Sequence, residues 1–289
     1  MRYVPPVFRP PSEADSLILQ VTLGCSHNAC TFCGSYKGKR FRVKDWPEIE
    51  AHIDEAKQYV PDTRRIFLAD GNALVHSQEV LLKILNKLYR DFPSLERVGI
   101  YASPKDVLNK SREELAGLKA AGLGIVYLGL ESGHDQILAD IKKGATASQM
   151  IEAAKAVTGA GIKLSVTIII GIGGPERSGD HARATASVLN AMKPDYIGAL
   201  TLMVVKGTPL YKKMERGEFT ILSPREMLQE LRVLIENLSI EGCVFRSNHA
   251  SNYLPLKGTL NRDKAGLLSL IDTALANEGL LRPEFMRGL

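Results

Sequence analysis

The sequence has no run of about 20 uninterrupted apolar residues, the length that a membrane-spanning helix needs. Its first residues, Met1-Arg2-Tyr3-Val4-Pro5-Pro6, lack the apolar stretch of a secretory signal peptide. Only 4 of its 289 residues are cysteine, and most of these are clustered, so a disulfide framework is excluded. Together these absences predict a cytoplasmic protein with no membrane partner.

What is present is the composition of a globular protein, with 45% hydrophobic and 24% charged residues. The net charge of +5 permits a nucleic-acid or acidic partner without requiring one. No low-complexity linker interrupts the chain, and its length suits one large domain. We therefore expect a single domain.

Short β-rich runs alternate with amphipathic helical stretches. The expected strands are 17–23, 65–69, 97–101, 124–129, 164–170 and 196–202, and the helices between them are 46–59, 78–89, 112–121, 147–159 and 181–192. Nearly continuous apolar strands are typical of a parallel sheet that is covered on both faces. Six such units predict an α/β fold, a partial (βα)6 barrel of the TIM type with a C-terminal extension.

The barrel core is expected over residues 1–240. Residues 241–289 are expected to be a C-terminal extension that closes the barrel mouth as part of the same domain. Beyond the sixth unit the pattern predicts helices over 224–238 and 264–276 and a short strand over 243–246.

Three of the cysteines, Cys25, Cys30 and Cys33, form a C-x4-C-x2-C motif directly after the first expected strand. Three thiolates leave one coordination position vacant, as in an iron–sulfur cluster that offers its fourth iron to a ligand. A structural zinc site needs four protein ligands, so the zinc alternative requires His27 or Cys243 as the fourth. The spacing does not match the common zinc patterns, which favours the cluster.

With Phe32 just before its last cysteine, the motif resembles that of the radical S-adenosylmethionine (radical SAM) superfamily, whose usual spacing is C-x3-C-x2-C. The resemblance extends over about residues 18–209. It points to the branch that contains coproporphyrinogen dehydrogenase, the elongator catalytic subunit and the tRNA methylthiotransferases. It implies a [4Fe–4S] cluster on the three cysteines with S-adenosylmethionine bound at the unique iron. It also implies reductive cleavage to methionine and a 5′-deoxyadenosyl radical.

The resemblance assigns roles to segments that follow the second and third strands. Asp70-Gly71-Asn72 corresponds to a glycine-rich segment whose backbone carbonyls bind the amino group of S-adenosylmethionine, although Asp70 replaces a usual glycine. Ser103 occupies the place of a ribose-binding acid.

Three more elements of the resemblance follow in order. Gly129-Leu130-Glu131-Ser132-Gly133 matches a segment in which Glu131 reaches the ribose or the amino group. Lys143 matches a basic residue that pairs with the methionine carboxylate. Thr167 and Gly171 are expected beside the adenosine, and Met203 and Val204 are expected to bind adenine through backbone groups. The remaining expected cofactor residues are Ser132, in the same segment as Glu131, and Phe32, which would pack over cluster or adenine.

Basic residues follow the cysteine motif at Lys37, Lys39, Arg40 and Arg42. They could contact an anionic substrate, dock a reducing partner such as flavodoxin or ferredoxin, or form a solvated face. Further along, residues 245–253 group cationic, amide and imidazole side chains. We expect Arg246, Asn248 and His249 there to contact substrate, with a capped turn as the alternative. Cys243 is expected to be a buried small residue.

The sequence thus predicts an enzyme that abstracts hydrogen from a small-molecule substrate, in preference to RNA. Only Cys243 remains outside the motif, so no second cluster is expected. The net reaction stays open among oxidoreductase, transferase and lyase chemistry. The alternatives are a zinc- or cluster-containing binding protein without radical chemistry, and a tRNA-modifying enzyme on the same barrel.

Overall fold

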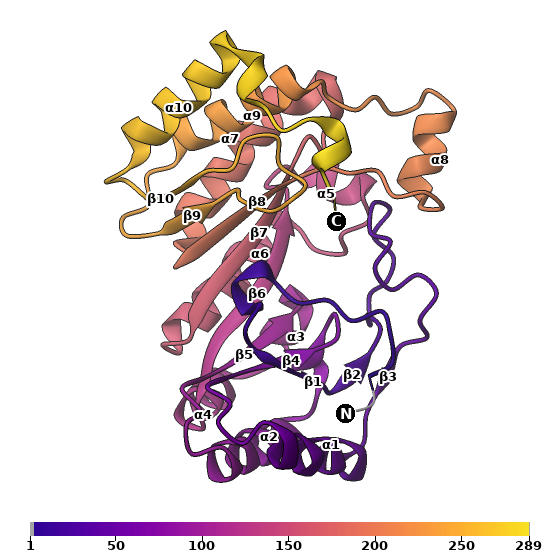
Figure 1. The fold of residues 1–289 in the computed structure, drawn as a ribbon, viewed down its shortest axis with the longest axis vertical. Helices are drawn as coiled ribbons and strands as arrows, with labels where there is room; N and C mark the ends of the chain where they lie inside the picture. Colours follow the sequence, from indigo (N-terminus) through magenta and orange to yellow (C-terminus); the bar gives the residue numbers. More distant parts are fainter. Residues whose placement is uncertain (1–2, 289) are drawn as a thin grey trace. The chain divides into compact units, whose positions relative to one another are not determined.

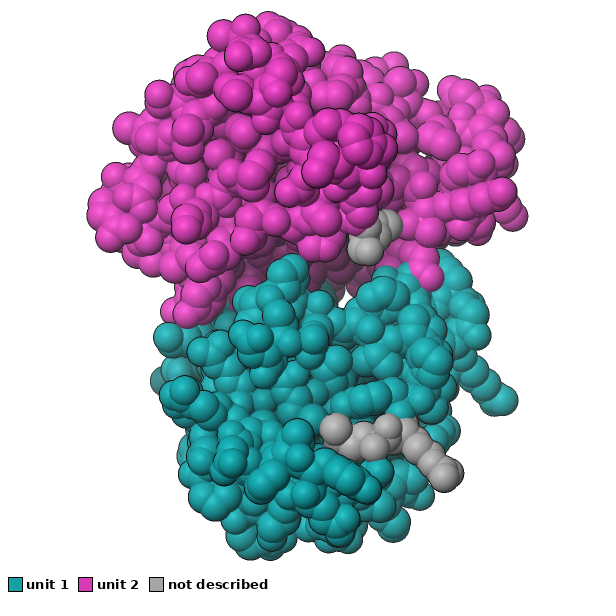
Figure 2. Space-filling model, in the orientation of Figure 1, with its two compact units in different colours: residues 1–28, 35–128, 155–164 teal, residues 29–34, 129–154, 165–289 magenta. Residues whose placement is uncertain are grey.

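The structure is a computed structural model that describes residues 3–288 (Figure 1). It divides into two compact units, which Figure 2 colours separately. Unit 1 comprises residues 1–28, 35–128 and 155–164, and unit 2 comprises residues 29–34, 129–154 and 165–289. No helix in the described part of the chain is long and apolar enough to cross a membrane.

Unit 1 is built on parallel strands in the order β1-β4-β5-β6. Their bounds are β1 (Leu17–Gln20), β4 (Arg65–Ala69), β5 (Arg97–Ala102) and β6 (Leu123–Glu131), of which residues 123–128 belong to this unit. Apolar side chains such as Phe67, Val98 and Val126 are fully buried. The ring of Phe67 also packs edge-on against Tyr101 and Tyr127. Such burial on both faces is what the continuous apolar runs predict.

The strand expected over 17–23 is broken at Val21. There the chain leaves its parallel partner, because the Val21 amide donates to Ala69 of β4 whereas its carbonyl accepts from Lys44. β2 (Thr22–Leu23) then pairs antiparallel with β3 (Arg42–Val43). The expectation of one strand was wrong because an apolar run does not reveal where the pairing partner changes.

The helices of unit 1 begin with side-chain caps. They are α1 (Trp46–Tyr59), α2 (Gln78–Asp91), α3 (Pro104–Leu108) and α4 (Arg112–Ala120), with the 3₁₀ turns η1 (Pro11–Glu13) and η2 (Ala73–Val75). Asp45 and Glu48 form a capping box at the start of α1, and Ser111 and Glu114 form one at α4. Each cap stabilises its helix by about 1 kcal/mol, which helps to fix where these helices start.

Unit 2 continues with strands in the order β7-β8-β9-β10. These are β7 (Lys163–Ile170), of which residues 165–170 belong to this unit, β8 (Tyr196–Thr201), β9 (Val244–Arg246) and β10 (Lys257–Thr259). β7, β8 and β9 run parallel to one another, and β10 is antiparallel to β9. The expected extension over 241–289 therefore continues the sheet of unit 2 through β9.

Helices flank these strands. They are α5 (Asp135–Asp140), α6 (Ala147–Gly159), α7 (Gly174–Met192), α8 (Pro209–Glu215), α9 (Pro224–Asn237) and α10 (Lys264–Ala276), followed by η3 (Glu278–Leu280) and η4 (Glu284–Met286). Residues 155–159 of α6 belong to unit 1. α9 packs against both α7 and α10 (Figure 1). α7 starts seven residues before the expected His181, because Pro175 occupies the first helical turn, where proline is tolerated. The mostly parallel α/β arrangement confirms the expected fold class.

Candidate cofactor site

The cysteine loop begins where β2 ends, and the buried carboxylate of Asp70 fixes its base. Asp70 Oδ2 accepts hydrogen bonds from the Gly24 amide at 3.0 Å and from Gln20 Nε2 at 3.0 Å. Lys39 Nζ lies 2.6 Å from the same oxygen. The Gly71 amide donates to the Gly24 carbonyl at 3.2 Å. Asp70 thus turns its side chain toward the loop base, where it ties the end of β4 to the start of the cysteine motif.

Lys39 does not share a face with its basic neighbours. Its side chain is only 6% exposed because it pairs with Asp70, whereas Lys37 and Arg40 are exposed. Arg42 is also exposed and pairs with Glu48. For Lys39 the interpretation as part of a basic docking surface was wrong, since a buried counter-charge holds the ammonium inside.

Asn72 links the cysteine loop to the end of β5. Its amide nitrogen donates to the Ser26 hydroxyl, and its Oδ1 accepts from the Ser103 amide at 3.2 Å. Gly71 lies so close to the loop that an added Cβ would be 3.1 Å from the Cβ of Cys25. Unit 1 therefore brings together Cys25, Gly71, Asn72 and Ser103. The Ser103 hydroxyl accepts from the Asp106 amide as the N-cap of α3, a use that the sequence did not reveal.

Residues 29–34, which carry Cys30 and Cys33, belong to unit 2. The Thr31 amide donates to the Ile141 carbonyl at 2.9 Å, and the Thr31 carbonyl accepts from the Leu210 amide at 2.9 Å. Phe32 is half-buried. This part of the loop is therefore held between the turn that precedes Lys143 and the start of α8.

The thiols themselves divide into two kinds. Cys25, Cys30 and Cys33 are partly exposed, whereas Cys243 is buried, and burial raises its pKa to about 12. Cys243 thus behaves as the buried small residue that was expected. Within residues 3–288 no three His, Cys, Asp or Glu side chains are gathered closely enough to hold a metal ion. The donor set nevertheless fits an iron–sulfur cluster, because three accessible thiols on one loop leave one iron open and zinc would need a fourth ligand.

Glu131, the last residue of β6, forms an ion pair with Lys143. Glu131 adopts a left-handed backbone conformation with φ of 63°, which is uncommon for a residue other than glycine. Its Oε1 lies 2.8 Å from Lys143 Nζ, and the two side chains are 11% and 14% exposed. A ligand that carries both an ammonium and a carboxylate can exchange partners with such a pair at little electrostatic cost.

Four of the expected cofactor residues lie on or just after the neighbouring strands β7 and β8. Thr167 of β7 is in register with Gly198 of β8, and the Leu202 amide donates to the Ile170 carbonyl at 2.9 Å. Gly171 follows β7 directly, and Met203 and Val204 follow β8. Thr167, Met203 and Val204 are partly exposed. The structure thus places Thr167 within β7 and the other three residues just after β7 and β8.

His181 and Glu230, which sequence reasoning missed, contact residues that follow β6 and β7. The His181 ring contacts Ser132, and Glu230 accepts from the Gly171 amide. The sequence did hold one sign of Glu230, which is a charged residue on the apolar face of a helix. Glu230 falls between Met227 and Leu234 in the buried stripe of α9.

The polar stretch 245–253 mainly builds its own loop. His249 Nδ1 lies 2.9 Å from the Ser251 hydroxyl and accepts from the Ser251 amide at 3.1 Å. Asn252 donates to the Ala199 carbonyl at 3.0 Å, which ties the loop to β8. Burial, with help from Arg282, lowers the pKa of His249, so the ring is neutral at pH 7. Arg246 and Asn248 are exposed, and substrate contact by Arg246, Asn248 and His249 stays a prediction.

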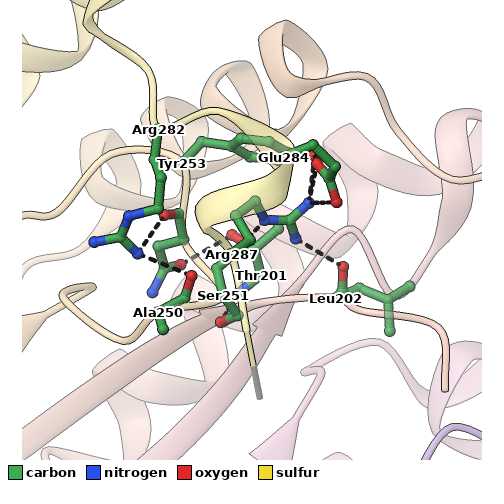
Figure 3. A network of polar contacts seen from close by, with 9 residues as sticks. Thr201, Leu202, Ala250, Ser251, Tyr253, Arg282, Glu284 and Arg287 are labelled. Carbon is green, nitrogen blue, oxygen red and sulfur yellow. Dashed lines mark hydrogen bonds and ion pairs between the residues drawn. The ribbon is translucent and has the colours of Figure 1, made fainter.

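Two arginines near the C-terminus clamp this loop (Figure 3). Arg282 donates to the Ala250 carbonyl at 2.8 Å, and Arg287 donates to the Ser251 carbonyl at 2.7 Å. The Arg287 guanidinium also lies over the Tyr253 ring at 3.9 Å and reaches the Leu202 carbonyl at the end of β8. The clamp fixes the loop beside the strand end that precedes Met203.

Comparison with known proteins matches residues 19–186 to the radical SAM superfamily. The chain is 28% identical over 171 residues to the methylthiotransferase-like protein MJ0865 of Methanocaldococcus jannaschii, covering 54% of this chain and 35% of that protein. It is 26% identical over 118 residues to the tRNA uridine(34) acetyltransferase of the same organism, covering 40% and 22%. The chain thus spans well under half the length of these relatives.

Two solved structures show the same fold. The radical SAM methyltransferase TsrM of Kitasatospora setae, solved with cobalamin and a [4Fe–4S] cluster, aligns with a TM-score of 0.56 at 18% identity, over 68% of this chain and 38% of that one. Coproporphyrinogen III oxidase (HemN) of Escherichia coli, a radical SAM enzyme, aligns with a TM-score of 0.56 at 14% identity, over 76% and 51%. These alignments confirm the expected partial barrel of the TIM type.

Proposed function

Because the chain belongs to the radical SAM superfamily, we propose that it is a radical SAM enzyme that abstracts hydrogen from a small-molecule substrate. Cys25, Cys30 and Cys33 would hold a [4Fe–4S] cluster. When bound, the reduced cluster supplies the electron that cleaves S-adenosylmethionine and so generates the hydrogen-abstracting radical. We retain residues 1–240 as the core and 241–289 as an extension of the same domain.

One observation carries the proposal. The cysteine loop is divided between the two units. Each part forms hydrogen bonds, within its own unit, to segments that are expected to bind S-adenosylmethionine. In unit 1 the loop base is bonded to Asp70 and Gly71, and Ser26 is bonded to Asn72. In unit 2 Thr31 is bonded to Ile141, two residues before Lys143.

The residues around the loop would bind and orient the methionine part of the cofactor. The Lys143 ammonium would pair with its carboxylate, and Glu131 would accept from its amino group or ribose hydroxyls. The two side chains are largely shielded from water, which strengthens these charge contacts. Thr167, Gly171, Met203 and Val204 would line the adenosine, with Phe32 over cluster or adenine.

The substrate and partners belong to the same proposal. Arg246 and Asn248 are exposed, so their side chains can form hydrogen bonds with a polar small molecule, and His249 follows them in the chain. Exposed Lys37 and Arg40 follow the cysteine loop, where they would attract an acidic electron donor such as flavodoxin or ferredoxin. A cytoplasmic location would keep the thiols reduced.

The test is anaerobic reconstitution with iron and sulfide, followed by dithionite reduction and mass-spectrometric measurement of 5′-deoxyadenosine. Cys30→Ala should abolish product, because one thiolate ligand is lost. Cys243→Ala is the matched control and should retain both the cluster and the product, since that thiol is buried.

Other outcomes separate the alternatives. Zinc in place of iron, with no cleavage of S-adenosylmethionine, would support a binding protein and contradict the proposal. Salt-dependent tRNA binding by an otherwise active enzyme would replace the small-molecule substrate with RNA.

A further inference from the structure

A buried histidine–glutamate pair connects two helices of unit 2. His181 lies on α7 and Glu230 on α9, and their side chains are 1% and 0% exposed. His181 Nε2 is 3.4 Å from Glu230 Oε1. Burial of two titratable groups is costly unless hydrogen bonds satisfy them, so their remaining contacts reveal what they hold.

The contacts of His181 fix its protonation. Nε2 lies 3.1 Å from the Ile169 carbonyl as well as near Glu230, and both neighbours accept hydrogen bonds. Nε2 therefore carries the proton, and Nδ1 accepts from the Ser132 hydroxyl at 2.8 Å. Burial lowers the pKa of His181 to about 4, with a contribution from nearby His134, so the ring is neutral at pH 7.

Glu230 holds the residue that follows β7. Its Oε1 accepts from the Gly171 amide at 2.6 Å, and its Oε2 accepts from the Ser178 hydroxyl at 2.5 Å. Gly171 has φ of 85° and lies so close to α9 that an added Cβ would be 2.5 Å from the sulfur of Met227. Glu230 thus satisfies the amide of a residue whose left-handed backbone and close packing favour glycine.

His181 and its neighbour Thr185 hold the end of β6 in the same way. The Ser132 hydroxyl, bonded to His181, accepts from the His134 amide at 3.0 Å. The Thr185 hydroxyl accepts from the Gly133 amide at 2.9 Å. These bonds hold the two residues that follow the left-handed Glu131, whose carboxylate pairs with Lys143.

We propose that His181 and Glu230 are positioning residues that place the S-adenosylmethionine-binding ends of β6 and β7 relative to each other. The inference rests on the proposed function of those ends. Neither residue contacts the cofactor in this proposal. Their effect passes through Ser132 and Gly171.

The test measures the dissociation constant of S-adenosylmethionine by equilibrium dialysis, for the reconstituted wild-type protein and for reconstituted variants. His181→Gln, which cannot reach Ser132, and Glu230→Leu, which leaves the Gly171 amide unsatisfied, should each weaken binding about tenfold or more. Glu230→Gln still accepts from Gly171 and should stay within about twofold. Glu236→Gln, an exposed change on the same helix, is the matched control.

Amide hydrogen exchange in the protein without S-adenosylmethionine is the second readout. Residues 130–133 should exchange faster in His181→Gln, and residues 169–173 should do so in Glu230→Leu. Should Glu230→Leu fail to fold, His181→Gln alone decides. Wild-type affinity in His181→Gln would overturn the positioning role while leaving the proposed function intact. A wild-type protein with an intact cluster that binds no S-adenosylmethionine would overturn both, whatever the exchange rates.

Discussion

Two buried carboxylates, one in each unit, are neutralised in different ways. Asp70 in unit 1 lies 2.6 Å from the Lys39 ammonium, and both side chains are nearly inaccessible. Glu230 in unit 2 faces a neutral histidine, and burial raises its pKa to about 7. One carboxylate has a fixed counter-charge, whereas the other holds a proton near neutral pH.

The difference follows from what each carboxylate must hold. Asp70 gathers three donors at the base of the cysteine loop, one of which is the buried Lys39 ammonium. Glu230 holds one backbone amide and one hydroxyl, which either protonation state can satisfy.

The largest effect on stability should come from removing the Lys39 ammonium, the buried cation that pairs with Asp70 in unit 1. Lys39→Met leaves Asp70 charged and unpaired in the interior, so the free energy of unfolding should fall by about 3–5 kcal/mol. Urea unfolding at pH 7 measures it. Lys37→Met, an exposed change two residues away, should cost less than about 0.5 kcal/mol. Equal losses in the two variants would show that the buried pair is not what secures the loop.

The next effect concerns pH and the pair in unit 2. His181 has a pKa of about 4 instead of its ordinary 6.5, so the unfolded chain binds more protons and its contribution to stability rises with pH between these values. Glu230 has a pKa of about 7 instead of 4.5, so its contribution falls as pH rises through that window. In the wild-type protein the two nearly cancel.

Replacing either His181 or Glu230 alone should reveal the pH dependence of stability that the other residue contributes. Relative to wild type, Glu230→Gln should gain stability with rising pH between about 4.5 and 6.5, by about 1 kcal/mol per pH unit. His181→Gln should show the opposite slope, and the double variant should run parallel to wild type. Chemical unfolding at several pH values measures these slopes. Curves for both single variants that run parallel to wild type would contradict the assignment of the proton to Glu230.

A third carboxylate, Glu131, extends the comparison. Its partner Lys143 is expected to pair with the carboxylate of S-adenosylmethionine as well. Lys143→Ala should weaken binding of S-adenosylmethionine by about tenfold to a hundredfold, since a charge-assisted contact is lost. Equilibrium dialysis measures it, with the exposed Lys155→Ala on α6 as the control. Unchanged affinity would remove Lys143 from the cofactor site.

The smallest effect should come from an exposed pair near the cysteine loop. Arg42 and Glu48 are bonded, but their side chains are 50% and 38% exposed. Arg42→Ala should change the free energy of unfolding by about 0.5 kcal/mol or less, because solvent screens such pairs. A loss as large as that of Lys39→Met in the same urea experiment would mean that burial does not separate the two pairs.

The βα alternation was predictable because each apolar run and each helical period is a local pattern. The helix at 264–276 was predicted at its observed bounds, and the strand at 243–246 is β9 with one residue fewer. The break at Val21 could not be predicted, since it depends on β3, which lies about 20 residues away in the chain.

The site shows the same limit. The order of the motifs singled out Cys25, Glu131 and Lys143, because each belongs to a local sequence pattern, and their roles stay predictions. The inward turn of Lys39 and the meeting of His181 with Glu230 depend on contacts between distant segments. The sequence pattern around a basic residue in a charged run, or around a glutamate in a helix, is the same whether the side chain is buried or exposed.

The most direct test of the central claim is the electron paramagnetic resonance spectrum of the reduced, reconstituted protein, with and without S-adenosylmethionine. The account predicts a [4Fe–4S] signal that S-adenosylmethionine shifts in the wild type and in Cys243→Ala, and that is lost in Cys30→Ala. A cluster signal that S-adenosylmethionine leaves unchanged in the wild type would contradict an open iron held by Cys25, Cys30 and Cys33.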